Sequence, residues 1–414
     1  MTSNIKKNYV LIIISIFLSV TCLISKATFE KCVWLTTVHN SDWPKSKDAE
    51  EQKVELRNII KDIHFKGISK VFFQVRPRGD ALYNSEMFPW SVWLTGELAK
   101  NPGYDPLRLC IDECNRYGIK CEAWINPFLV LEKNMEYNKN DYISKLPDGN
   151  PIKKHPEWLV KYYEQKDDKG NNFEKYILNI GIPEVRDLII KEVEYICKNY
   201  DVSGIHIDDY FYPYPCKGNI DNFDINTYNE YKSGQLKMNK EVMSIDDWRR
   251  DNVNKFIKSV HNSLKKLDKT FSVSPFGIWK NVKNSRGSGK DTNGLESYNS
   301  ISCDSKKWVE EGWIDYIVPQ IYWECGHDRA DFVTLSDWWN NLIKEANKKL
   351  KDKKVKLLLG LSVYKIDENT MGPNWESPDE IKKQINIAKK LSDVSGVSLF
   401  SYKHVERNLG FLNS

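Results

Sequence analysis

Short apolar segments alternate with longer amphipathic segments along most of this chain. Eight of the short segments are rich in β-branched and aromatic residues and apolar on both faces, which is typical of parallel strands covered by helices. We expect these strands at residues 32–38, 70–75, 119–124, 204–208, 271–275, 316–319, 355–360 and 396–401. Helical periodicity predicts helices between them at residues 50–66, 106–117, 183–199, 246–267, 306–312, 331–350 and 378–391. Proline in the first turn of several of these helices supports their starting points.

Eight strands alternating with helices predict an α/β fold, the (β/α)8 or TIM barrel. A doubly wound open sheet is the alternative, but no glycine-rich phosphate turn follows the first strand. The last expected strand lies close to residue 414, so we expect one barrel domain over residues 28–414 and no appended C-terminal domain. The longest connections, 126–181 and 276–302, emerge on the face where barrel active sites form, and we expect them to wall a substrate cleft.

The N-terminal segment has the pattern of a secretory signal peptide. Two lysines precede an uncharged apolar run over residues 9–24, and small residues at positions 25 and 27 suit cleavage. The run is shorter than the roughly twenty residues of a membrane-spanning helix. We therefore expect residues 1–27 to be a signal peptide and the protein to be exported to the periplasm or cell envelope. A lipid anchor on Cys22 is the alternative, although Thr21 stands where such sites have a smaller residue.

Charge and cysteine usage narrow the class of function. The formal net charge of +4 becomes 4 − 3 = +1 without the three lysines of residues 1–27, so nothing resembles the concentrated positive field of a nucleic-acid-binding protein. Eight of the nine cysteines follow residue 27, and they show neither zinc-binding spacing nor a CxxC pair. We expect mostly small buried cysteines, no metal or other cofactor, no nucleotide, and a monomer as the default oligomeric state.

Two acids and several aromatic rings follow the strand at residues 204–208. The segment 204–213 reads Gly-Ile-His-Ile-Asp-Asp-Tyr-Phe-Tyr-Pro. Asp208 and Asp209 are the first catalytic candidates, because glycosidic cleavage needs one carboxyl to protonate the leaving oxygen and another to attack or to activate water. Neighbours on a strand face opposite sides, so both reach one pocket only if the strand ends at Asp208 and the turn re-aims Asp209. A cap or a salt bridge is the alternative role for Asp209.

Glu324 is the second carboxylate of the leading catalytic pair. It closes the segment Pro-Gln-Ile-Tyr-Trp-Glu at 319–324, where Gln320 and Tyr322 share its face if the extended geometry persists. Aromatic surroundings would raise the pKa of its carboxyl by desolvation, as a general acid requires. A surface acid beside His327 is the alternative.

The candidates for substrate binding are polar and aromatic side chains at or near strand ends. Stacking on the apolar face of a sugar ring suits the aromatic members. The polar members have structural alternatives: an Arg76–Asp80 clamp, a buried ion pair for Glu122, a loop cap for Asn126 and an interior position for His206. The set is Trp34, Arg76, Asp80, Glu122, Trp124, Asn126, His206, Tyr210, Trp279, Gln320, Tyr322 and Trp323.

Several longer motifs resemble those of a known family. They are Trp-Leu-Thr-Thr-Val at 34–38, Gln-Val-Arg-Pro-Arg-Gly-Asp at 74–80, Ala-Trp-Ile-Asn-Pro at 123–127, the segment 204–213, Ser-Pro-Phe-Gly-Ile-Trp at 274–279 and Pro-Gln-Ile-Tyr-Trp at 319–323. In this order they resemble the bacterial glycosyl-hydrolase-like family ten, from about residue 31 to the end. The resemblance implies a TIM barrel that acts on bacterial polysaccharide, similar to divisome-localised glycosidases that cut peptide-stripped peptidoglycan strands. This chain has Glu122 where the family pattern leads us to expect histidine.

These features together predict an exported glycoside hydrolase whose partner is a polysaccharide, with peptidoglycan favoured by the resemblance. A barrel that binds glycan without cutting it is one alternative. Metal-assisted deacetylation or phosphoester cleavage is another, with a cation held by His206, Asp208 and Asp209.

Overall fold

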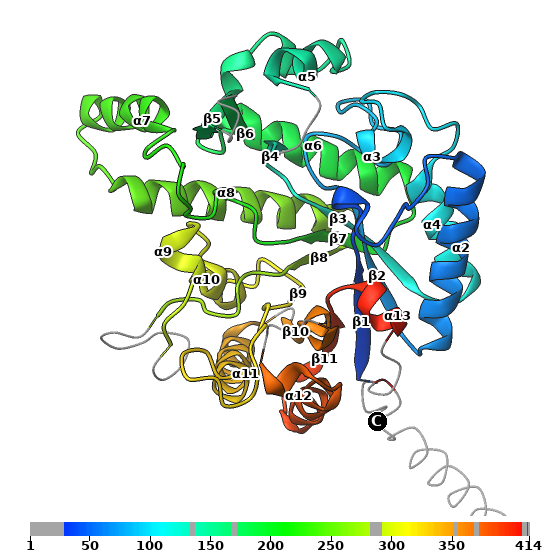
Figure 1. Cartoon of the computed structure of the whole chain (residues 1–414). Helices are drawn as coiled ribbons and strands as arrows, with labels where there is room; N and C mark the ends of the chain where they lie inside the picture. Colours follow the sequence, from blue (N-terminus) through cyan, green and yellow to red (C-terminus); the bar gives the residue numbers. More distant parts are fainter. Residues whose placement is uncertain are drawn as a thin grey trace, which may run out of the picture.

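The chain forms a closed barrel of eight parallel strands surrounded by helices (Figure 1). This computed structural model describes residues 29–132, 137–166, 172–281, 292–351, 354–367, 372–407 and 412. The barrel strands are β1 (Glu30–Leu35), β2 (Lys70–Arg76), β3 (Lys120–Ile125), β7 (Gly204–Ile207), β8 (Thr270–Val273), β9 (Tyr316–Ile317), β10 (Lys356–Leu361) and β11 (Val394–Leu399). They follow one another around the barrel in chain order, and β11 closes it by pairing with β1. The predicted (β/α)8 fold and all eight expected strands are confirmed.

The helices that cover the barrel begin and end close to the residues that periodicity predicted. The seven expected helices are α2 (Ala49–Phe65), α4 (Pro106–Arg116), α6 (Pro183–Asn199), α8 (Ile245–Lys266), α10 (Ser305–Glu310), α11 (Phe332–Lys349) and α12 (Asp379–Lys390). Shorter helices lie in the connections: α3 (Val92–Thr95), α5 (Lys139–Lys145), α7 (Ile225–Lys237), α9 (Ser297–Ser300) and α13 (Tyr402–Arg407). Side-chain caps fix several starts; for example, Asp105 accepts a hydrogen bond from the Arg108 amide at 3.1 Å, one residue before Pro106. None of the helices in the described ranges is long and apolar enough to cross a membrane, and the predicted signal peptide lies outside those ranges.

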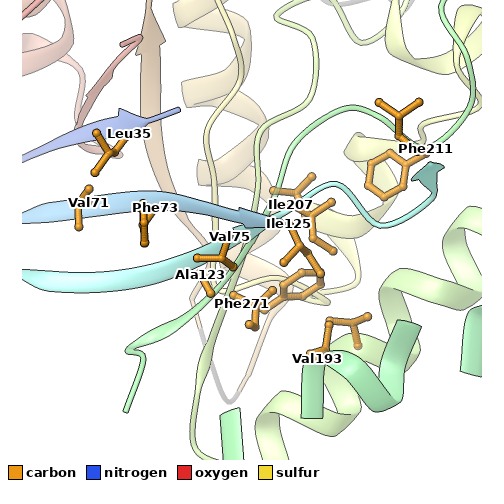
Figure 2. Packing of buried hydrophobic residues seen from close by; sticks show 14 of the residues in the cluster. Leu35, Val71, Phe73, Val75, Ala123, Ile125, Val193, Ile207, Phe211 and Phe271 are labelled. Atoms are coloured by element: carbon orange, nitrogen blue, oxygen red, sulfur yellow. The ribbon is translucent and has the colours of Figure 1, made fainter. Parts of the chain in front are cut away.

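The main hydrophobic core lies between the outer face of the barrel and the helices. Phe73 of β2, Ile125 of β3, Ile207 of β7 and Phe271 of β8 point outward into this layer, where Val193 of α6 also lies (Figure 2). All five are fully buried. Because successive strand residues face opposite sides, the same strands send a different set of side chains into the barrel.

The inside of the barrel is partly aromatic and partly polar. Trp34, Phe72, Trp124 and Tyr316 belong to a small apolar cluster inside the barrel. Polar interior side chains such as His206 lie among them, so the interior is not the uniformly aliphatic filling that is common in TIM barrels.

The connection between β3 and β7 carries a small antiparallel sheet in addition to α5. Its strands are β4 (Leu129–Leu131), β5 (Leu159–Lys166) and β6 (Asn172–Leu178), in the order β4-β6-β5. In Figure 1, α5, β5 and β6 lie together at the top of the view, beyond the barrel strands. The sequence predicted a cleft wall here but no sheet, because β5 leaves the polar residues 164–166 exposed and so lacks a clear buried face.

Most cysteines in the described part of the chain are buried, as expected, and all of these described cysteines are free thiols. Three of them come together although their spacing gave no sign of it. The Sγ atoms of Cys110 and Cys114 on α4 and of Cys121 on β3 lie within 4.8 Å of one another. The helix α4 therefore packs on β3 partly through sulfur.

Candidate active site

The end of β7 sets the geometry of the two leading acids. The strand ladder ends at Ile207, one residue earlier than expected, where the Ser274 amide donates to the Ile207 carbonyl at 2.9 Å. The chain then turns, with the Tyr210 amide donating to Asp208 Oδ1 at 3.2 Å. Because the turn starts here, Asp208 and Asp209 both line one pocket instead of facing opposite sides of a strand.

This pocket is a hollow of about 280 Å³ at the C-terminal ends of the barrel strands, where TIM barrels keep their active sites. It combines acids, an amide and aromatic rings from different strands. The predicted site residues that line it are Asp208, Asp209, Trp34, Trp124, Asn126, Tyr210, Gln320 and Tyr322. Thr36, Val38, Gln74, Pro77, Leu129, Glu132, Tyr214, Ser274, Tyr364 and Phe400 complete the lining.

Asp208 is held in a form that favours its protonated state. Burial raises the pKa of its carboxyl well above the ordinary 3.8, and the negative charge of Asp209 raises it further. Hydrogen bonds from the Tyr210 amide and from Trp124 Nε1 (3.0 Å) lower this pKa only in part. A carboxyl whose pKa is raised in this way is suited to act as a general acid.

Asp209 is buried as well but gives up its proton more easily. Burial raises the pKa of its carboxyl to about 6, against the lowering effect of hydrogen bonds from Tyr214 and Gln320. The Tyr214 hydroxyl donates to Asp209 Oδ2 at 2.6 Å. The two acids therefore share a pocket with unequal proton affinities, which is the arrangement that separates acid and base roles in many hydrolases.

Among the buried polar atoms of the lining, Asn126 Oδ1 and the Tyr322 hydroxyl are two that have no hydrogen-bond partner among the described residues. Buried polar groups in native proteins are nearly always bonded, so a partner from outside the chain is expected at these two positions. Sugar hydroxyl and acetamido groups offer suitable donors and acceptors.

The structure does not bring Glu324 into this pocket, which corrects the expectation that it pairs with Asp208. β9 is only two residues long, and the chain turns after it, with the Ile321 amide donating to the Pro319 carbonyl at 3.0 Å. The extended geometry therefore ends before Glu324. Its carboxylate accepts instead from Trp375 Nε1 at 3.1 Å.

Glu122 lies at the opposite, N-terminal end of the barrel, so it cannot bind a substrate beside Asp208. It is 1% exposed and its Oε1 lies 3.3 Å from Lys70 Nζ. Thr270 (3.1 Å), Ser272 (3.2 Å) and Tyr316 donate hydrogen bonds to its carboxylate. Its structural alternative, a buried ion pair, is the one the structure supports.

Arg76 and Asp80 are both buried under the loop that follows β2, and neither lines the pocket. The Arg76 guanidinium donates to the backbone carbonyls of Asn126 and Pro127, the latter at 3.0 Å. Asp80 accepts from Ser91 Oγ at 2.5 Å. Each side chain holds a loop in place, and the expected roles in substrate binding are corrected accordingly.

His206 lies beneath the pocket as an interior residue. Its Nε2 accepts from Trp34 Nε1 at 3.0 Å and is 3.1 Å from Ser274 Oγ, so its proton is on Nδ1, which lies 2.8 Å from Ser272 Oγ. Burial lowers the pKa of this imidazole well below its ordinary value, which keeps it neutral. His206 therefore fixes the Trp34 ring in the pocket floor and does not itself contact the hollow.

Two further aromatic candidates lie outside the pocket. Trp279 Nε1 donates to Asp304 Oδ1 at 3.1 Å, and its ring stacks on Trp338 at a centroid distance of 6.0 Å. Trp323 packs beside the His327 ring, with centroids 6.4 Å apart. Neither ring lines the hollow that holds the acids.

Several lining residues that loops and inserts contribute were not predicted from the sequence. Tyr214 follows the conspicuous segment 204–213 by one residue, and its place beside the aromatic run was a usable signal. Glu132 follows the short strand β4, and nothing in the sequence pattern marks it. Loop residues of this kind are positioned by tertiary packing, which periodicity does not encode.

Comparison with known proteins identifies the family to which this fold and pocket belong. The model of the family described as glycosyl hydrolase-like 10 matches residues 30–377. The chain belongs to this family. A relative named glycosyl hydrolase YngK, from Bacillus subtilis, is 37% identical over 390 residues, which cover 93% of this chain and 70% of the relative. Glycosyl hydrolase DigH from Escherichia coli is 32% identical over 393 residues, covering 91% of this chain and 83% of the relative.

A solved structure agrees with the fold. The glycoside hydrolase domain of PgaB (BpsB) from Bordetella bronchiseptica superposes with a TM-score of 0.52 at 12% identity, over 92% of this chain and 96% of that domain. At this identity the likeness concerns the architecture alone. Family membership and fold together give a glycosyl-hydrolase-like TIM barrel, as the motifs implied.

Proposed function

We propose that this protein is an exported glycoside hydrolase that cleaves the glycan strands of peptidoglycan by acid/base chemistry at Asp208 and Asp209. The observation that carries the proposal is the pair of adjacent buried carboxyls in one aromatic pocket, with pKa values raised to different extents. Membership of a glycosyl-hydrolase-like family supports the reaction class. The N-terminal segment 1–27 supports export through a cleaved signal peptide, and a lipid anchor at Cys22 is the less favoured alternative.

In the proposed mechanism the two acids have different tasks. Asp208 protonates the glycosidic oxygen as the bond to the anomeric carbon breaks, and ionised Asp209 stabilises the positive charge that develops on the sugar. Water then adds to the anomeric carbon and the proton that it loses restores Asp208. Tyr210 and Tyr322 are among the partly exposed rings of the lining on which a sugar ring can stack, and the unsatisfied Asn126 Oδ1 can accept from a hydroxyl or acetamido group.

The metal-assisted alternative finds little support in the donor set. Trp34 and Ser274 engage His206 Nε2, and Ser272 engages its Nδ1, so neither ring nitrogen is free to join Asp208 in holding a cation. Within the described residues, the three-thiol group on α4 and β3 is the metal-capable cluster, and it lies outside the pocket.

Purified sacculi, with and without amidase pretreatment, test the proposal when the released fragments are weighed by mass spectrometry. We expect glycan fragments from the wild-type protein in the presence of a chelator, and none from Asp208→Asn. Binding to strands without any fragments would identify a binding barrel instead. Loss of fragments on chelation would identify the metal-assisted reaction.

A further inference from the structure

Three cysteines meet between α4 and β3 on the outer side of the barrel, away from the pocket that holds the two acids. Cys110 and Cys114 lie one turn apart on the buried face of α4. Cys121 belongs to β3 and shares its outward face with Ala123 and Ile125, which point into the layer beneath the helices (Figure 2). None of the three cysteines lines that pocket. The cluster is therefore separate from the proposed reaction and needs an explanation of its own.

The spacing of the three sulfur atoms suits the coordination of a single ion. The Sγ atoms of the three cysteines lie within 4.8 Å of one another, and those of Cys110 and Cys121 are 3.9 Å apart. Thiolate sulfurs bind a d10 metal ion at about 2.3 Å, so three of them in a trigonal plane are roughly 4 Å apart. The cluster therefore needs only small side-chain adjustments to hold an ion at its centre.

No histidine or acidic side chain within the described ranges joins these sulfurs as a fourth ligand. Glu113, the acid next to the cluster in sequence, lies instead against Arg57 (3.4 Å) and Arg116 (3.3 Å). The three cysteines are at most 4% exposed, which leaves little access for a water ligand. A structural zinc site has four protein ligands, so this cluster does not complete one.

The surroundings of the cluster favour an ion of low charge. The three cysteines belong to the main hydrophobic core, where a net charge costs far more free energy than in water. A monovalent ion and one thiolate form a neutral pair, whereas a divalent ion requires two thiolates. Soft sulfur donors select Cu(I), which also accepts three ligands. Donor type, ligand number and charge therefore indicate the same ion.

We propose that Cys110, Cys114 and Cys121 form a binding site for Cu(I) between α4 and β3. Binding forms copper–sulfur bonds, and each thiol that loses its proton releases it to the solvent. Copper stays in the +1 state throughout, so no oxidant or reductant takes part. Because the cysteines are buried, the ion enters as the chain folds or when α4 separates locally from β3. The bound ion joins the helix to the strand that carries Trp124 of the pocket, so it stabilises the fold without taking part in cleavage.

Competition for Cu(I) with the chromophoric chelator bicinchoninate tests the site when the protein is refolded without oxygen in the presence of the ion. We expect one tightly held ion per chain and a higher Tm for the loaded protein. Cys110→Ala should weaken binding by about a hundredfold or more, because even partners outside a coordination shell contribute about 10–100-fold. Cys303→Ala is the matched control, because it removes a thiol that is equally buried but lies outside the cluster. It should bind Cu(I) and gain Tm as the wild type does.

X-ray absorption of the copper-loaded wild type identifies the ligands and does not depend on whether Cys110→Ala folds. We expect only sulfur neighbours around copper, at about 2.3 Å. Nitrogen or oxygen neighbours, or equal affinities in Cys110→Ala and Cys303→Ala, would overturn the site. A disulfide between two of the three cysteines in the protein as isolated, found by peptide mass spectrometry, would overturn it as well. Retention of Zn(II) in the presence of equimolar Cu(I) would overturn the choice of ion.

Discussion

The two ends of the barrel both bury carboxyl groups, but they treat the charge in opposite ways. At the N-terminal end, Glu122 lies against Lys70 and accepts three hydrogen bonds. Burial lowers the pKa of the Lys70 ammonium, but negative neighbours, Glu122 first, outweigh it and raise this pKa to about 12. At the C-terminal end, Asp208 and Asp209 lie side by side without a described cation in an ion pair with either.

The difference separates a structural role from a chemical one. A buried charge with a partner of opposite sign and satisfied hydrogen bonds holds neighbouring strands together. Two buried acids of like sign make the fold less stable at neutral pH and leave a proton available for transfer. The same residue type therefore supports the barrel at one end and is poised for catalysis at the other.

The largest expected effect comes from removing Asp208, an acid at the C-terminal end of the barrel. Asp208→Asn should lower kcat for strand cleavage by about 10²–10⁴-fold, because the amide cannot donate the proton that a general acid supplies. Initial rates of release of reducing ends measure this change. Glu122→Gln is the comparison variant and should keep its rate per folded molecule within a few-fold of wild type. Comparable losses of kcat in the two variants would contradict the assignment of catalysis to the C-terminal end of the barrel.

Breaking the Glu122–Lys70 pair at the N-terminal end of the barrel should instead lower the stability of the protein. Glu122→Gln removes the nearer of the two carboxylates beside the buried Lys70 ammonium and leaves Glu30 at 3.5 Å, so we expect the free energy of unfolding to fall by about 1–3 kcal/mol. Denaturation by urea measures it. The double variant Lys70→Met with Glu122→Leu should recover most of the loss, because it removes the buried ammonium together with its nearer carboxylate. Wild-type stability of Glu122→Gln would show that the pair contributes nothing.

At the C-terminal end of the barrel, removal of the Asp209 carboxyl should make the protein more stable. The pKa of Asp209 is about 6 in the folded protein and near 3.8 in an unfolded chain, so the folded state binds the proton more tightly. The contribution of this group to stability is therefore greatest below pH 4 and is lost as the pH rises through 6, by about 3 kcal/mol. Asp209→Asn should be more stable than wild type by about that amount at pH 7 and equal to it at pH 3.5. Urea unfolding at the two pH values checks this, and an equal difference at both would contradict it.

The sequence was most informative where local pattern and tertiary structure coincide. The barrel strands are apolar on both faces, and their helices repeat clearly, so the order of elements predicted the fold family. The small sheet β4-β6-β5 has no such pattern, and it forms because the barrel supplies a surface on which it can pack.

The candidate site divides in the same way. Asp208, Trp124 and Asn126 follow from their position at strand ends, which a parallel barrel gathers on one rim. The prediction that Glu122 binds substrate was wrong because alternation tells which face of a strand a residue lies on but not its position along the barrel axis. Glu122, two positions before Trp124, points into the barrel near its N-terminal end. The prediction for Glu324 was wrong because the chain turns at residues 319–321, shortly after β9, and this turn depends on long-range packing.

The smallest expected effect is a shift in the pKa of Asp209 when its hydrogen bond from Tyr214 is removed. The Tyr214 hydroxyl donates to ionised Asp209 and lowers the pKa of this carboxyl, so Tyr214→Phe should raise it. If cleavage requires ionised Asp209, the acidic limb of the kcat/KM profile lies near pH 6 and should move upward by roughly half to one pH unit in this variant. Tyr162→Phe is the matched control, because Tyr162 is a buried tyrosine that does not line the pocket of the two acids, and its acidic limb should stay in place. If the acidic limb moves equally in both variants, or in neither, it reports the ionisation of a group other than Asp209. The contrast between the two ends of the barrel would then depend on Asp208 alone.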